Sequence, residues 1–284
     1  MSRDKKPSRP LAGADTQNES GETAMHDTAP PLRRGCRTAL RLLLLYCLCL
    51  APTLVRAESG EDIIRRVEDN LNGESAFLQL TMVVQTKRSK RTMKMESWSV
   101  GTEKSFIRIT YPGKDKGITF LKIDNAMWQY VPRIEKTIKI PASMMLQSWM
   151  GSDFTNDDLV RESSISEDYL AELQGEDETG YLVDLHAREE APVVWSRIRM
   201  HVSRDHYLPT TVRYYDEEDN LVRILEYLEV RRYGERFYPS RWLMLPQSPD
   251  KAGHQTEVII DQAVFDEEID EAYFSKRALK RFSS

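Results

Sequence analysis

Cysteine is almost absent from this sequence, and its placement limits the chemistry available to the protein. The chain of 284 residues has three cysteines, all within the first 57 residues: Cys36, Cys47 and Cys49. The rest of the chain therefore has no disulfide, no thiol chemistry and no cysteine-based metal site to offer.

A long hydrophobic run is also missing. The longest apolar stretch, Leu42–Leu50, is shorter than the roughly 20 residues that a membrane-spanning helix needs. A cluster of arginines precedes it, and Val55-Arg56-Ala57 follows it with a small-residue exit. This pattern predicts a cleaved secretory signal rather than an uncleaved membrane anchor. We expect residues 1–57 to be a polar extension and signal, and residues 58–284 to form one exported, periplasmic domain.

Two details of this leader stay open. Arg33-Arg34 suggests a twin-arginine signal, but Gly35-Cys36-Arg37 fits that pattern poorly, and the strongly apolar core favours ordinary secretion. The segment before the arginines is long for a signal, so either Met1 or Met25 could be the true start.

An excess of positive charge is the third absence. Residues 58–284 contain 31 basic and 40 acidic residues, which gives a net charge near −9. Such a balance argues against nucleic acid, and against an anionic membrane surface, as the main partner.

Residues that carry catalysis or bind metals do not gather in recognised patterns. Asp153, Asp157 and Asp158 lack the glycine and terminal carboxylate of an EF-type calcium loop, and with Thr155 they favour the start of a helix. Ser152 has no nucleophile-elbow context, and no glycine loop could hold a phosphate. The histidines after the leader are scattered and predict surface or turn positions: His186, His201, His206 and His254. We expect no catalytic residue, no metal and no cofactor.

What the sequence does contain is first a helix and then many strands. Glu61–Leu71 has helical apolar spacing, with Ser59 and Asp62 at capping-box spacing and Gly73 as a stop. Beyond Gly73 the apolar period changes to two, and turn residues recur at hairpin spacing. The predicted strands are Phe77–Thr86, Thr92–Val100, Ser105–Tyr111, Gly117–Ile123, Met127–Val131, Tyr181–His186, Trp195–Val202, Thr210–Tyr215, Leu221–Val230, Phe237–Leu245 and Thr256–Phe265.

Helical pieces complete the predicted elements. The region from Pro141 to Gly175 is rich in methionine and then acidic, without strand alternation. We expect short helices there at Ala142–Trp149 and Thr155–Ser163, and a helical C-terminal segment at Asp270–Phe282.

So many antiparallel strands in one domain must curl, because neighbouring strands are rotated by roughly 20°. The expected fold class is mainly β with a few helices (α+β). Its core is a curved antiparallel sheet that forms an incomplete barrel of about eleven strands. At this strand number the interior is wider than side chains easily fill, so helices are expected to cover an apolar hollow.

Methionine marks the expected hollow, since seven of the nine methionines after the leader lie between Met82 and Met150. Thioether side chains adapt to more than one ligand, although any single methionine is better explained as ordinary core. For the cluster we favour a ligand-facing cavity, with the segment between Pro141 and Gly151 as a lid. The candidate lining residues are Met93, Met95, Trp98, Phe106, Phe120, Trp128, Met144, Met145, Trp149, Met150 and Phe154.

Several long stretches carry a family resemblance. They include Asp115–Ile123, Met127–Pro132, Ile140–Met145, Ser148–Leu159 and Arg241–Met244. Through them, and over nearly all of residues 58–284, the sequence resembles the LolA-like outer-membrane lipoprotein-sorting proteins. It is most similar to the branch often associated with resistance-nodulation-division type exporters.

The resemblance implies an incomplete barrel that carries lipoprotein acyl chains or other lipids across the periplasm. It also implies an inner-membrane exporter and an outer-membrane acceptor as candidate partners, with the carrier itself a monomer. Two alternatives remain: a non-enzymatic envelope module that regulates an exporter or senses lipoproteins, and an enzyme acting on lipid head groups. No candidate catalytic set supports the enzyme.

Overall fold

The computed structural model describes residues 58–161, 165–191 and 193–283. The predicted polar extension, the signal and all three cysteines lie outside the described residues. Within the described ranges, no helix combines the length and the apolar character needed to traverse a bilayer.

The N-terminal helix forms as its sequence predicts. α2 spans Gly60–Asn72 and begins at Ser59, whose Oγ accepts the Asp62 N–H at 3.1 Å and donates to the Asp62 carboxylate at 2.7 Å. It ends at Gly73, which has a φ of 63°. One face of α2 is buried and anchors the helix to the inner side of the sheet through Ile63, Ile64 and Val67.

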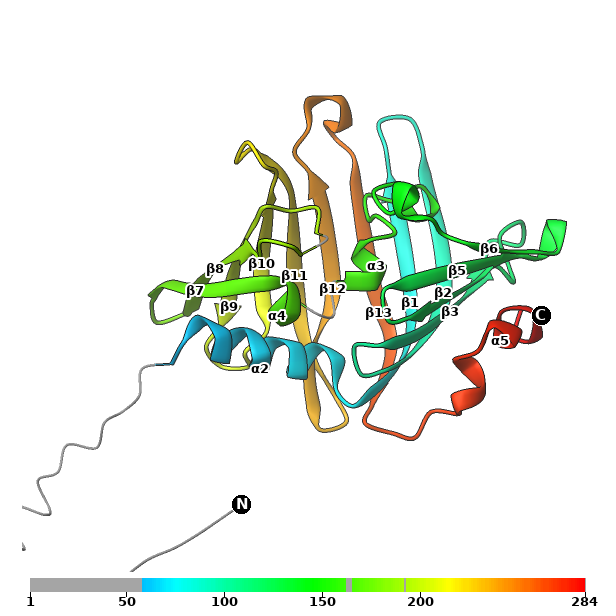
Figure 1. Ribbon diagram of the computed structural model, residues 1–284, viewed down its shortest axis with the longest axis horizontal. Helices are drawn as coiled ribbons and strands as arrows, with labels where there is room; N and C mark the ends of the chain where they lie inside the picture. The colour runs from blue at the N-terminus through cyan, green and yellow to red at the C-terminus, as the bar shows by residue number, and fades with distance from the viewer. Residues whose placement is uncertain (1–57, 162–164, 192, 284) are drawn as a thin grey trace, which may run out of the picture. The chain divides into compact units, whose positions relative to one another are not determined.

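A single sheet of 13 antiparallel strands makes up most of the fold, which confirms the expected class (Figure 1). The first group of strands is β1 (Ser75–Gln85), β2 (Lys90–Val100), β3 (Lys104–Tyr111), β4 (Thr119–Ile123), β5 (Ala126–Val131) and β6 (Lys136–Lys139). The second is β7 (Tyr169–Glu176), β8 (Gly180–Ala187), β9 (Arg197–Ser203), β10 (Pro209–Tyr215), β11 (Leu221–Tyr233), β12 (Arg236–Pro246) and β13 (Gln255–Phe265).

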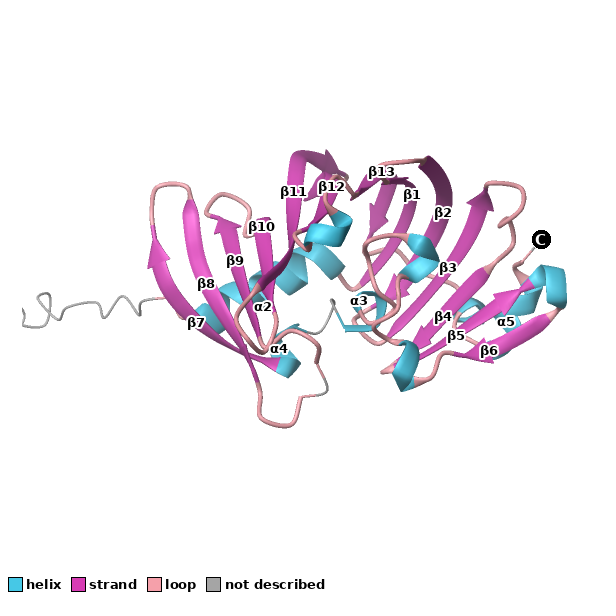
Figure 2. Cartoon of the chain, turned by 90° about the horizontal axis from the view of Figure 1, so that it is seen from above, coloured by secondary structure: helices cyan, strands magenta, loops and turns pink. Residues whose placement is uncertain are grey.

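The order of strands dictates how the chain crosses the sheet. It runs β6-β5-β4-β3-β2-β1-β13-β12-β11-β10-β9-β8-β7, so β6 and β7 are the two edges and the sheet is not closed. The chain must therefore pass from one edge to the other between β6 and β7. Residues 140–161, which end in α3 (Asp158–Arg161), and α4 (Ile165–Asp168) lie along this passage on the inner side of the bent sheet (Figure 2). We call residues 140–161 the crossing segment.

The structure differs from the expected elements in the edge strands and in the short helices. β6 and β7 were not predicted, and the acidic stretch around Tyr169–Glu176 is a strand rather than part of a helical region. The predicted helices are shorter than expected. In place of the first predicted helix the structure has 3-10 turns at Ala142–Met144 and Trp149–Gly151, and within the second it has α3. The C-terminal segment contains a 3-10 turn at Glu271–Tyr273 and then α5 (Lys276–Arg281).

Both faces of the first half-sheet are covered. On the outer face, the C-terminal segment packs over β2–β5, where Thr119 Oγ donates to the Leu279 carbonyl at 2.7 Å. Trp98 stacks on Tyr273 with a centroid distance of 4.5 Å. This outer core also includes Phe106, Leu121, Tyr130, Phe274, Ala278 and Leu279. The inner face carries the larger core, together with α2 and the crossing segment.

Candidate functional site

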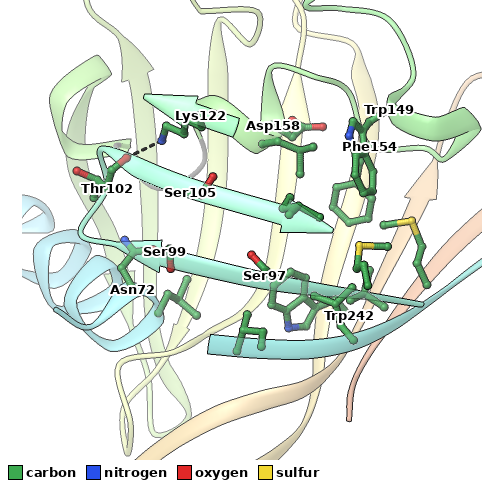
Figure 3. A pocket seen from close by; sticks show the side chains of 18 of the residues that line it. Asn72, Ser97, Ser99, Thr102, Ser105, Lys122, Trp149, Phe154, Asp158 and Trp242 are labelled. Carbon is green, nitrogen blue, oxygen red and sulfur yellow. Dashed lines mark hydrogen bonds between the residues drawn. The ribbon is translucent and has the colours of Figure 1, made fainter. Parts of the chain in front are cut away.

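A hollow of about 220 Å³ lies on the inner face, between β1–β3, β12–β13, the end of α2 and the crossing segment. Figure 3 shows that its lining divides into a polar and an apolar end. Every second residue of β1, β2 and β3 points inward, and along β2 the inward side chains change from Met95 to Ser97 and Ser99, which gives the two ends. The site is thus built mainly from rigid sheet and closed by one irregular segment.

The apolar end is formed where the crossing segment meets the sheet. Trp149 and Phe154 are 1% and 4% exposed, and Trp149 packs on Phe120 with a ring-centroid distance of 5.3 Å. Opposite them, Met95 pairs across the strands with Leu80. Further apolar lining comes from Leu78, Met82, Ile107, Leu159, Tyr227, Tyr238, Trp242 and Val258.

The polar end lies at the β2–β3 turn and the end of α2 (Figure 3). Lys122 is 5% exposed, lines the hollow, and donates from Nζ to the Thr102 carbonyl at 2.5 Å. Small hydroxyl and amide side chains surround it, namely Ser97, Ser99, Ser105 and Asn72. A cavity with a cation and hydroxyl groups at one end and thioether and aromatic groups at the other suits an amphiphilic molecule.

Polar contacts hold the crossing segment against the sheet. Asp153 reaches β13, where its N–H donates to Thr256 Oγ1 at 2.9 Å and its carboxylate accepts from the same hydroxyl at 2.8 Å. From β2, the Arg91 guanidinium donates to the Met150 carbonyl and lies against Gly151. Met150 itself has a φ of 50°, a conformation that costs a non-glycine residue energy unless its surroundings impose it.

The strongest of these contacts is a buried ion pair. Asp158, on α3, and Arg223, on β11, are 8% and 4% exposed and form a bidentate pair, with Arg223 Nη1 donating to Asp158 Oδ2 at 2.6 Å. The rings of Trp195 and Tyr214 flank the guanidinium, at 4.4 and 4.2 Å from its carbon. The pair ties the end of the crossing segment to the second half of the sheet.

The aspartates of the crossing segment do more than begin a helix, which is the role that the sequence predicts for them. Thr155 and Asp158 do form reciprocal capping bonds, with Asp158 N–H donating to Thr155 Oγ1 at 3.2 Å and Thr155 N–H to Asp158 Oδ2 at 2.7 Å. The contacts of these aspartates with distant strands could not be predicted from the sequence, because the partners Thr256 and Arg223 lie far along the chain. Among the described residues, no group of three histidine, cysteine, aspartate or glutamate side chains is placed to hold a metal.

The candidate lining residues fall into three groups. Five are buried in the inner core, and of these Met95, Trp149 and Phe154 line the hollow, whereas Met93 and Phe120 pack behind it. Three methionines of the crossing segment are half-buried against the same core: Met144, Met145 and Met150. The remaining three lie on the outer face with the C-terminal segment, away from the hollow: Trp98, Phe106 and Trp128.

Sequence reasoning missed the serine row and the contribution of β12. Ser97, Ser99 and Ser105 point inward beside Met95 and Ile107, so the alternation that located the apolar side chains could also have located these hydroxyls. Trp242 was not singled out because a single inward aromatic residue on a strand resembles ordinary core.

Solved structures with the same architecture define the class of fold. A DUF1329 family protein from Desulfovibrio piger is 21% identical, with a TM-score of 0.72 over 78% of this chain and 97% of that chain. An outer membrane lipoprotein-sorting protein domain from Vibrio parahaemolyticus is 19% identical, with a TM-score of 0.69 over 78% and 98%. The LolA superfamily protein NE2245 from Nitrosomonas europaea is 16% identical, with a TM-score of 0.67 over 78% and 100%. The fold is therefore LolA-like.

The sequence also matches a family. The model of a DUF1329-like family, described as uncharacterized proteins, matches residues 101–281, which is more than half of the chain. The protein belongs to this family. The search of curated proteins found no match.

Proposed function

We propose that the protein is a periplasmic carrier that binds acyl chains, of lipoproteins or of other lipids, in the hollow and conveys them toward the outer membrane. The amphiphilic lining of the hollow is the observation that carries this proposal. The names of two structural neighbours, a lipoprotein-sorting domain and a LolA superfamily protein, support it. The predicted signal in residues 33–57 supplies the route to the periplasm.

The energetic reason for such a carrier is the apolarity of the cargo. Each CH₂ group moved out of water gains about 0.8 kcal/mol, so an acyl chain leaves a membrane only for a protein surface of similar character. The apolar end of the hollow, with Met95 and Trp149, offers such an apolar surface without covalent chemistry. A binding role therefore needs no catalytic residue.

The hollow must widen to accept a whole chain. Its volume of about 220 Å³ lies below the roughly 300–1,000 Å³ of ordinary ligand pockets. The crossing segment is the element that can move, because it is irregular and fastened by separate contacts at Arg91, Thr256 and Arg223. We infer that its displacement lengthens the hollow, as expected of a lid.

The lining also implies an orientation of the cargo. The tail would lie under Trp149 and Phe154, and the polar head would face Lys122 and the serine row at the β2–β3 turn. The Trp149 indole N–H is buried without an acceptor among the described residues, which costs about 1–3 kcal/mol.

Blocking the hollow tests the proposal. Leu80→Trp fills the hollow from β1, whereas Thr81→Trp places the same side chain on the opposite, solvent-facing side of that strand. We expect the first variant to lose binding of a fluorescent fatty acid by about tenfold or more, because overlapping side chains exclude the tail. The second should bind as the unchanged protein does.

Lipid extraction and mass spectrometry of protein purified without detergent give an independent readout. Lipid should be recovered with the unchanged protein and with Thr81→Trp, but not with Leu80→Trp. Recovery of no lipid from any of them, together with no fatty-acid binding, would contradict the carrier and leave the envelope binding or regulatory module as the better explanation.

A further inference from the structure

Exposed basic residues gather at one corner of the molecule. They come from the β3–β4 turn, from the β5–β6 hairpin and from α5, which lie together at the β6 edge (Figures 1 and 2). The same three stretches contain two carboxylates, Asp115 and Glu135. We call this group the basic corner: Lys114, Lys116, Arg133, Lys136, Lys139, Lys276, Arg277, Lys280 and Arg281.

Close contacts hold the three stretches together. Gly117, in the β3–β4 turn, leaves no room for a side chain, because a Cβ there would collide with the Ser283 carbonyl oxygen and lie 3.2 Å from Pro132 Cγ. On the outer face, the ring of Trp128 contacts two ammonium groups, with Lys276 Nζ at 4.8 Å and Lys139 Nζ at 5.6 Å from its centroid. The basic corner is therefore a fixed surface and not a chance neighbourhood of loops.

Within the described ranges, no carboxylate forms a salt bridge with the basic corner. Elsewhere in the described chain, arginines and lysines commonly pair with carboxylates, as Arg199 does with Asp184 and Arg236 with Asp266. None of the nine residues of the basic corner takes part in any salt bridge of the described residues. In a chain with a net negative charge, such a concentration of free cations creates a strong local field.

Exposed apolar side chains stand among these cations. Ile134 is 53% and Ile138 41% exposed, both on the β5–β6 hairpin between Arg133 and Lys139. Cations interleaved with aliphatic side chains are the composition of surfaces that rest on a bilayer, where the cations meet phosphates and the aliphatic groups enter the interface.

We propose that the basic corner docks the protein on an anionic phospholipid surface. An acidic protein partner would use the cations but would leave Ile134 and Ile138 without a role, so the bilayer is the better fit. This inference is independent of the hollow. The net negative charge argued against an anionic membrane as the main partner. The net charge, however, averages over faces of the molecule that differ in sign, and the basic corner is one positive face.

Vesicle binding tests the proposal. The protein, in the form that cells accumulate, is sedimented with vesicles of phosphatidylcholine alone or mixed with phosphatidylglycerol. We expect binding only to the anionic vesicles, and its loss between about 0.1 M and about 1 M salt as the screening length shortens. The combined change Lys116→Glu, Arg133→Glu and Lys136→Glu should lower the bound fraction about tenfold or more.

A matched control reverses three exposed charges of the β1–β2 hairpin, with Lys87→Glu and Arg88→Glu in its turn and Lys90→Glu at the start of β2. It changes the net charge equally and should alter binding less than about twofold. If the first set of reversals disturbs the fold, glutamine is placed at the same three positions instead and should also lower the bound fraction. The loss of binding of the unchanged protein with rising salt is then the second readout.

Equal binding to neutral vesicles, an equal loss in the control, or retention on polyglutamate but not on anionic vesicles would overturn membrane docking. Because fatty-acid binding is measured separately, loss of vesicle binding with intact uptake would reject this inference and leave the proposed carrier in place.

Discussion

At the scale of single residues, the most consequential features are carboxylates held by arginines. Asp158 and Asp184 are both buried, and each accepts two hydrogen bonds from one guanidinium. Burial of such a charge is tolerated only while its partner remains, since an isolated ion in the interior is strongly unfavourable. Changes at these positions should therefore be costly.

Asp158→Asn should destabilise the protein by about 3–5 kcal/mol, because it removes the carboxylate that forms a buried bidentate pair with Arg223. The free energy of unfolding, measured with urea, provides the check. Asp219→Asn, which breaks an ion pair whose carboxylate is 69% exposed, should change stability by about 1 kcal/mol or less. Similar losses of stability in the two variants would show that the pair of Asp158 and Arg223 is exposed to solvent rather than buried.

The pair of Asp184 and Arg199 predicts a pH dependence. The hydrogen bonds from Arg199 hold the pKa of the Asp184 carboxyl below its usual value, although burial opposes this shift. A depressed carboxyl pKa contributes stability in full above the unfolded value near pH 4, and this contribution is lost as the pH falls through the folded pKa.

Asp184→Asn should therefore cost about 1–3 kcal/mol at neutral pH, and the difference from the unchanged protein should shrink below about pH 4. Urea unfolding across this pH range measures it. Glu176→Gln, in an exposed pair with Arg204, serves as the control and should show little difference at any pH. If the difference in the free energy of unfolding between Asp184→Asn and the unchanged protein stays constant at acid pH, ionisation of Asp184 is not its cause.

Residue types and faces could be predicted from the sequence only in part. Alternation along β2 puts Met95 and Trp98 on opposite faces of the sheet, but the candidate lining residues include both. Both faces of β2 are apolar, because the C-terminal segment covers the outer one. For that reason Trp98, Phe106 and Trp128 were grouped with the residues of the hollow, whereas the structure places them in a separate core.

At the scale of elements, the crossing segment decides access to the hollow. Its position follows from topology, since the chain has to pass from β6 to β7 across the inner face. Its closure depends on few contacts, and the Arg91 bond to the Met150 carbonyl also holds Met150 at positive φ. Loss of this bond should release the segment locally without unfolding the sheet.

Arg91→Ala should raise amide hydrogen exchange in residues 148–152 by about tenfold or more, in line with the roughly 1.5–3 kcal/mol of a hydrogen bond from a charged donor. The rate of fatty-acid entry should rise as well. Lys90→Ala, at the neighbouring exposed position, is the matched control and should leave exchange unchanged. Unaltered exchange in Arg91→Ala would mean that other contacts close the segment.

Long elements were predictable and short ones were not. α2 carried its capping signals in the sequence, and the eleven predicted strands are all present. β6 has four exposed residues and no apolar alternation, so its strand state depends on pairing with β5. β7 does alternate, with Tyr169 buried, but its acidic residues and helical surroundings concealed the pattern. In both cases tertiary context overrides local preference.

At the scale of the whole molecule, the fold has two cores separated by the sheet. The outer core depends on the C-terminal segment, whose Phe274, Ala278 and Leu279 cover the outer side of β2–β5. Without this cover a contiguous apolar patch with Trp98 and Phe106 would face water, and patches of that kind promote association.

A chain that ends after Asp266 should therefore be less stable and should self-associate as its concentration rises. Light scattering and urea unfolding test this expectation. A chain that ends after Phe282 keeps the cover and should behave as the unchanged protein does. A monomeric, equally stable truncated chain would show that the segment is dispensable for the sheet.

The pairing of β1 with β13 has a consequence for how the protein is made. These strands are neighbours in space, yet β13 is the last strand of the chain and β1 the first. While the exported chain is still emerging from the membrane, each hairpin ladder can form, but the seam that joins the two ladders has to wait for residues 255–265. Contacts so distant along the chain form slowly. The folding polypeptide therefore remains two unjoined ladders until β13 has emerged.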